Sequence, residues 1–171
     1  MCFGRYNRIR KEETLNKLQI ILDETNFQIS KLNTASSGYY VQIDDVAFPN
    51  RQWNDLSVAV IEMWLVVLNR HLLGVENEAV LNFMDGDYEI RLCKESSFCS
   101  VASFVEPDGS ISYSTSVDVL YFARQLLSVS SKTMNTLHAH TSTYGTMKLE
   151  ELGNSLRATV NKLSKTRNSS H

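Results

Sequence analysis

The feature that most constrains the fold is a long apolar stretch in the middle of the chain. Between Asp55 and Leu73, apolar residues cover most of a helical circumference: Leu56, Val58, Val60, Ile61, Met63, Trp64, Leu65, Val67, Leu68 and Leu72. A helix that is apolar on nearly all sides is buried in a core. The sequence therefore predicts a central buried helix. We expect Asn54 or Asp55 to cap its N-terminus and Gly74 to end it.

The residues before this helix predict a shorter helix and a β-hairpin. Apolar residues recur at helical spacing over residues 9–22, which are therefore expected to form an amphipathic helix. Residues 27–32 and 39–43 are typical of strands and are separated by a polar connection. We expect these two strands to pair as a hairpin, with Pro49 closing the unit.

The sequence after the central helix predicts an antiparallel meander. Four strands are expected, at residues 79–84, 88–92, 98–105 and 110–113. The dipeptide Asp-Gly between the first two is typical of a tight hairpin turn. Apolar and charged residues alternate over residues 88–92, which places them on opposite faces of a strand.

Two amphipathic helices are predicted in the last third of the chain. The first is expected to begin at a capping box over residues 115–118 and to end near His138. The second is expected over residues 147–163, and the polar tail 164–171 is expected to fray. The predicted fold class is α+β, with an antiparallel sheet of five or six strands packed against the central helix and the two C-terminal helices.

Length and composition favour one domain over residues 1–171, because 43% of the 171 residues are apolar. No apolar run reaches the roughly 20 residues that a membrane span needs, and the first residues lack the apolar core of a secretory signal. The cysteines, Cys2, Cys93 and Cys99, are odd in number and form no Cys-x-x-Cys pair, which favours reduced thiols. We therefore expect a cytoplasmic protein with no membrane partner.

The charged residues are distributed unevenly along the chain. Residues 44–118 carry thirteen acidic and four basic side chains, a net charge of −9, whereas residues 1–43 carry +2 and residues 119–171 carry +5. A negative field of this size repels nucleic-acid phosphates and attracts a basic protein. The charge therefore predicts a basic protein partner and no nucleic acid. A solvated acidic surface without a partner explains the charge equally well.

A few residues have the chemistry of catalytic or metal-binding groups, but a simpler interpretation fits each of them better. Asp85, Asp87 and Glu89 have the spacing of carboxylates in a cation loop, but the sixth position is isoleucine rather than the glycine that a calcium loop needs. His138 and His140 lack a third histidine nearby. The sequence contains none of the common catalytic or phosphate-binding motifs. We therefore expect no catalytic residues, no metal and no cofactor, and the protein is not expected to be an enzyme.

Part of the chain resembles a known family. Residues 48–56 contain Trp53, the central helix contains Trp64, and residues 81–92 contain an Asp-Gly hairpin followed by an alternating strand. Together these features resemble small bacterial immunity proteins encoded beside polymorphic or contact-dependent toxins, over about residues 40–92. The resemblance implies a protein that binds a cognate toxin domain in the cytosol and occludes its active site.

The expected toxin-binding surface consists of acidic residues near the ends of the central helix and in the hairpin. These are Asp44, Asp55, Glu76, Glu78, Asp85, Asp87 and Glu89. Trp53 is a further candidate, as an aromatic contact, although packing in the core is the alternative interpretation. Two other functions stay open: a small enzyme that uses the hairpin carboxylates, and an adaptor that self-associates through the apolar face of residues 149–163. The oligomeric state is not predicted.

Overall fold

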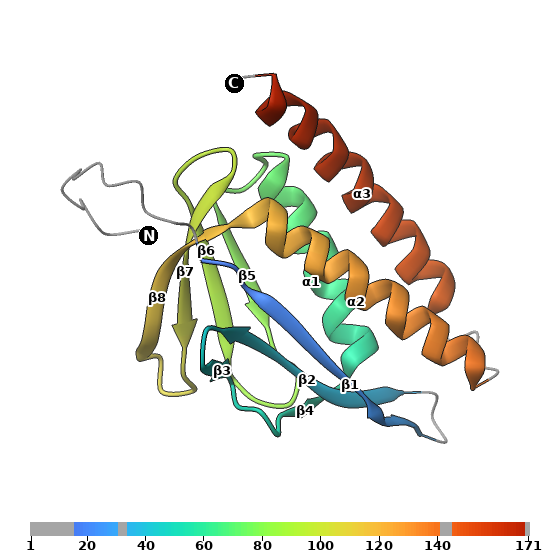
Figure 1. The fold of residues 1–171 in the computed structure, drawn as a ribbon. Helices are drawn as coiled ribbons and strands as arrows, with labels where there is room; N and C mark the ends of the chain where they lie inside the picture. Colours follow the sequence, from blue (N-terminus) through green and yellow to red (C-terminus); the bar gives the residue numbers. More distant parts are fainter. Residues whose placement is uncertain (1–15, 31–33, 141–144, 170–171) are drawn as a thin grey trace.

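The computed structural model describes residues 16–30, 34–140 and 145–169, and it confirms an α+β fold with antiparallel sheets (Figure 1). The first sheet contains β1 (Gln19–Ile29), β2 (Ala35–Ile43), β3 (Val46–Phe48) and β4 (Asn54–Asp55). The second contains β5 (Glu78–Asn82), β6 (Glu89–Lys94), β7 (Cys99–Val105) and β8 (Ile111–Asp118). The helices are α1 (Ser57–Leu72), α2 (Val119–Ala139) and α3 (Thr146–Asn168). The described strands thus form two sheets of four rather than one sheet of five or six.

The central helix forms as predicted and lies in the middle of the molecule. α1 contacts β2, β5, α2 and α3, so both sheets and both C-terminal helices cover it (Figure 1). Gly74 follows the helix with a φ of +75°, a conformation that glycine adopts without strain. The predicted N-cap is wrong, because Asn54 and Asp55 form β4 and Leu56 occupies the cap position without a side-chain hydrogen bond.

The first sheet is where the structure differs most from the expected fold. Residues 19–22 were expected in a helix, but they pair with residues 39–42 of β2 in antiparallel register. Leu18 and Ile20 are both buried, which is the period of two that a strand requires. The predicted hairpin is confirmed, with β1 beginning eight residues earlier than residue 27. Residues 16–18 of the predicted helix are not helical either. Residues 9–15 lie outside the described residues.

The second sheet is the predicted meander, with its strands in the order β5-β6-β7-β8. β8 extends to Asp118, so residues 115–117 continue the strand instead of forming a capping box. Asp118 itself caps α2, because its Oδ1 accepts a hydrogen bond from the backbone N–H of Tyr121 at 2.9 Å. Its Oδ2 pairs with Arg167 at 2.9 Å, and α3 stays helical to Asn168 where a frayed tail was expected from residue 164.

An aromatic cluster forms the centre of the core. Trp64 lies 5.3 Å from Tyr39 and 5.2 Å from Phe83, measured between ring centroids, and Phe48 lies 5.1 Å from Phe104. These rings come from β2, β3, α1, the β5–β6 connection and β7, so the cluster joins both sheets to the central helix. The predicted burial of Trp64 is confirmed, with 0% of its surface exposed.

Two further findings concern the helices and the cysteines. No helix in the described ranges is long and apolar enough to cross a membrane. Cys93 is disulfide-bonded while Cys99 is a free thiol, so the prediction of reduced thiols is wrong for Cys93. An odd number of cysteines leaves one thiol free but does not preclude a disulfide. Reduced thiols therefore no longer support a cytoplasmic location, which stays a prediction.

Candidate functional site

The clearest gathering of the predicted acidic residues is at the connection between β5 and β6. Asp85 and Asp87 lie in this connection and are exposed, and Glu89 begins β6. Antiparallel pairing places Glu89 opposite Val105, at the end of β7, which brings the turn that begins with Glu106 beside the same connection. The residues of the β5–β6 connection, 83–88, are called the acidic loop below.

The acidic loop and the β7–β8 turn enclose a surface hollow of about 330 Å³. Three carboxylates line it, from Asp87, Glu89 and Glu106, and the described residues that line it include no lysine or arginine. Arg91 donates a hydrogen bond from Nε to Glu89 at 2.7 Å, so one of the three carboxylates is partly neutralised. We call the feature formed by Asp87, Glu89 and Glu106 the acidic hollow. A cationic side chain is the ligand chemistry that it suits.

Asp55 lies beneath the acidic loop and holds it. Its side chain is only 2% exposed, so Asp55 is not part of the accessible acidic surface. The backbone N–H of Met84 donates to both carboxylate oxygens, at 3.2 and 3.0 Å. The backbone N–H of Leu56 donates at 2.7 Å and the indole N–H of Trp53 at 3.2 Å. One buried carboxylate therefore ties the start of α1 to the acidic loop.

The electrostatics of Asp55 reflect this burial. Loss of water raises the pKa of the carboxyl above its ordinary value, the three donors oppose the increase, and the charge of Asp85 adds to it. Burial, together with the charge of Asp55, also raises the pKa of Tyr39. The Tyr39 hydroxyl is buried and has no hydrogen-bond partner among the described residues. Asp55 thus stays in an unfavourable environment because it satisfies donors that would otherwise be unpaired.

Trp53 supports the same loop from one side. Its ring centroid lies 4.9 Å from that of Tyr88 and 6.4 Å from that of Phe83. A Cβ atom on Gly86 would lie 3.1 Å from the Trp53 ring, and Gly86 has a φ of +154°. The loop therefore needs glycine at this position. Trp53 is half-buried and packs against the loop, which is the structural alternative that the sequence left open.

The other predicted acidic residues lie elsewhere. Asp44 is exposed in the β2–β3 turn, and Glu76 pairs with Arg70 at 2.6 Å. Glu78 begins β5 opposite Cys93, at the end of the strand away from the acidic loop. The structure therefore brings together Asp85, Asp87 and Glu89 but not the full predicted set. It adds Glu106, which the sequence analysis missed although the antiparallel meander would have placed it beside Glu89.

Two groups have the chemistry of catalytic residues, but one is inaccessible to substrate and the other is held in its unreactive form. His71 Nε2 and Ser100 Oγ lie 2.8 Å apart, but the two residues are 1% and 0% exposed, so no substrate reaches the pair. The Cys99 thiol donates to Glu95 at 3.2 Å, and burial followed by that carboxylate raises its pKa to about 12. It is therefore a protonated thiol at neutral pH. In the ranges that the structure describes, no three His, Cys, Asp or Glu side chains are grouped to hold a metal.

His71 gives a testable dependence of stability on pH. Burial lowers the pKa of its imidazole below the ordinary value of 6.5, the charge of Lys94 lowers it further, and Glu76 opposes the change. As the pH falls below 6.5, the unfolded chain binds a proton that the folded protein does not. We therefore expect the free energy of unfolding to decrease from neutral pH until the pH passes the folded pKa.

Urea unfolding between about pH 5 and 8 measures this effect against a His71→Gln variant, which keeps a polar group for Ser100 and does not titrate. The raised pKa of Asp55 is common to both proteins, so it cancels in the difference between their curves. Parallel curves across this range would show that His71 does not contribute.

Comparison with known proteins gave no match: no family model matches the chain, and neither a curated protein nor a solved structure does. The function is therefore inferred from the geometry of the described residues. The acidic hollow with its supported loop is the feature that this geometry offers for binding.

Proposed function

We propose that the protein is an immunity protein that binds a cognate basic toxin domain at the acidic hollow and the acidic loop, and thereby occludes the active site of the toxin. The observation that carries the proposal is the geometry of the loop, which the Asp55 carboxylate supports from beneath and the Trp53 ring from one side. A surface that is ordered before binding loses less conformational entropy when a partner docks. Acidic side chains around a basic partner also accelerate association.

Apolar side chains beside the loop support a protein partner rather than a small cation. Met84 is 50% exposed and Leu56 is 37% exposed, and the backbone N–H groups of both bind the Asp55 carboxylate. The backbones of these two exposed apolar residues therefore meet at the carboxylate that lies beneath the acidic loop. An apolar centre with a charged rim is the usual anatomy of a protein interface.

The two alternative functions receive less support. Asp85 and Asp87 are exposed, whereas carboxylates that act as acid and base are commonly desolvated in a cleft. The apolar face of α3 is mostly used inside the protein, because Leu149, Leu156 and Val160 are buried in the core. That face is therefore a poor candidate for self-association.

Charge reversal tests the proposal. We expect Asp87→Lys combined with Glu106→Lys to weaken binding of the toxin domain encoded beside this gene by about 30-fold or more, since losing a desolvated charge pair costs at least 2 kcal/mol. The association rate should fall, and its dependence on salt should weaken. Calorimetry and stopped-flow kinetics over a series of salt concentrations measure both quantities.

The matched control reverses two acids outside the surface, Glu24→Lys and Glu151→Lys, which are both exposed. It changes the net charge equally, so it separates a local contact from the overall field. Equal affinity of the two double variants for the toxin domain would contradict the proposed binding surface. A neighbouring gene that encodes no toxin would count against the immunity function itself.

A further inference from the structure

A row of exposed apolar side chains runs along the central helix. Ala59, Val66 and Leu73 are exposed, Val66 by 40% and Leu73 by 56%. They follow one another at intervals of seven residues, which is close to two helical turns, so they lie in one line along α1. Met63 is half-buried and lies beside this line. We call these four residues the α1 face.

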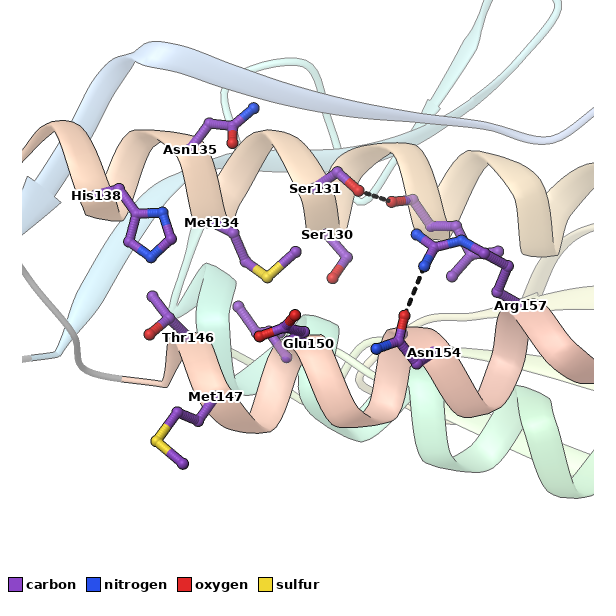
Figure 2. A pocket seen from close by; sticks show the side chains of 13 residues that line it. Ser130, Ser131, Met134, Asn135, His138, Thr146, Met147, Glu150, Asn154 and Arg157 are labelled. Carbon is purple, nitrogen blue, oxygen red and sulfur yellow. Dashed lines mark hydrogen bonds between the residues drawn. The ribbon is translucent and has the colours of Figure 1, made fainter.

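The other two helices have the usual polar surface, so the α1 face is an exception. α2 exposes Arg124, Ser128 and Lys132 to solvent. Figure 2 shows that most of the labelled side chains around the hollow between α2 and α3, such as Asn135 and Glu150, are polar as well. A helix that turns polar residues to solvent needs no partner on that side. A line of exposed apolar residues instead indicates a contact with another protein surface.

The charged residues that α1 carries beside this face are neutralised within the chain. Glu62 pairs with Lys148 of α3 at 2.8 Å, and Arg70 pairs with Glu76 at 2.6 Å. α1 therefore contributes no excess charge to the face, in contrast to the acidic hollow. Such a face does not attract a basic partner, and it does not repel a second copy of this chain, whose net charge is −2.

The positions of these charges favour an antiparallel second copy. Glu62 and Arg70 lie four residues before and four residues after Val66. When two α1 helices cross antiparallel at Val66, Glu62 of each copy lies level with Arg70 of the other. The small Ala59 then lies level with the larger Leu73. Opposite charges and complementary side-chain sizes are thus matched, whereas parallel helices would place like charges level with each other.

We propose that the protein forms a two-fold symmetric dimer through the α1 face, with antiparallel α1 helices and Val66 at the axis. Closed two-fold dimers are the commonest protein oligomers. The face extends about 21 Å from Ala59 to Leu73, and one helix of this length supplies less than the roughly 800 Å² per partner of a standard interface. We therefore expect a weak dimer, with a dissociation constant of about 10–100 μM. The dimer does not depend on the proposed toxin binding.

Analytical ultracentrifugation of the full chain at about 1–500 μM tests the dimer. Val66→Lys should weaken association about tenfold or more, because it brings two ammonium groups together at the axis. Lysine suits an exposed helix position at least as well as valine, so the midpoint of thermal unfolding should not fall. Ser128→Lys, on the exposed surface of α2, is the matched control and should associate like the parent. A parent that is monomeric at about 500 μM, or a Val66→Lys variant that associates like the parent, would overturn the proposal.

Arg70→Glu tests the antiparallel arrangement. Association should weaken about fivefold or more, because Glu62 of each copy then lies level with a second carboxylate. In a parallel dimer the change replaces one pair of like charges by another and would have little effect. Lys132→Glu, exposed on α2, changes the net charge equally and is the control. Equal effects of the two variants would contradict the arrangement. If the parent were monomeric and Val66→Lys weakened toxin binding, the α1 face would belong to the toxin interface, and the dimer would be wrong.

Discussion

Replacing Trp64 with alanine is expected to lower the free energy of unfolding by about 3–5 kcal/mol. The side chain is 0% exposed and packs against Tyr39, Phe83 and Phe122. Its indole N–H donates to the carbonyl oxygen of Asn82 at 2.8 Å, so truncation also removes the hydrogen bond that links α1 to the end of β5. Such a loss is a large part of the roughly 5–15 kcal/mol that stabilises a domain.

Urea unfolding of Trp64→Ala and Trp64→Phe separates the two contributions. Phenylalanine keeps most of the ring volume but cannot donate to Asn82, so we expect it to cost about 1–2 kcal/mol. Trp53→Ala should cost less than Trp64→Ala, because Trp53 is only half-buried. A Trp64→Ala protein within about 1 kcal/mol of the parent would contradict the position of Trp64 in the core.

The central helix could be predicted because its sequence permits one interpretation. Residues 55–73 would be apolar on most sides of a helix. The stretch is too long for a typical strand, so a buried helix is the interpretation that remains. The structure places α1 at Ser57–Leu72, within two residues of that expectation at each end. The predicted N-cap at Asn54 or Asp55 was wrong. A carboxylate that precedes a helix has the same sequence pattern whether it binds its own helix or a distant loop.

The first strand could not be predicted because local pattern and long-range pairing disagree. Leu15, Leu18 and Leu22 fit a helical stripe, while Leu18 and Ile20 fit a strand. Backbone pairing of residues 19–23 with β2 favours the strand over the helix. The local sequence carries no information about this long-range pairing. The predicted start of α2 was wrong for a similar reason. β8 continues through residues 115–117, and Asp118 caps the helix.

Only the part of the candidate site that is local in sequence could be predicted. Asp85, Asp87 and Glu89 lie together because a hairpin keeps neighbours in sequence close in space. The contact between Asp55 and Met84 joins residues 29 positions apart, so it depends on how α1 packs against β5. Asp44, Glu76 and Glu78 have the same charge as the residues of the acidic hollow but lie elsewhere. The charge of a segment does not show which of its residues lie together in the fold.

Asp55→Ala is expected to lower the free energy of unfolding by about 2–4 kcal/mol and to release the acidic loop. The change leaves the N–H groups of Leu56 and Met84 without their buried acceptor, and an unsatisfied buried donor costs about 1–3 kcal/mol. The burial that raises the pKa of Asp55 offsets part of the loss, because the parent also spends free energy on desolvating this carboxylate. The effect should be largest at the loop.

Hydrogen exchange at the amide of Met84 distinguishes this local effect from general destabilisation. In the parent this amide is bonded to Asp55, so it should exchange slowly, and Asp55→Ala should accelerate it more than amides of α1 such as that of Leu65. Asp45→Ala, in the exposed β2–β3 turn, is the matched control and should change stability by no more than about 0.5 kcal/mol. If Met84 and Leu65 accelerated equally, Asp55 would stabilise the fold as a whole. The fixed geometry of the acidic loop would then need another cause, and the main support for a preorganised binding surface would be lost.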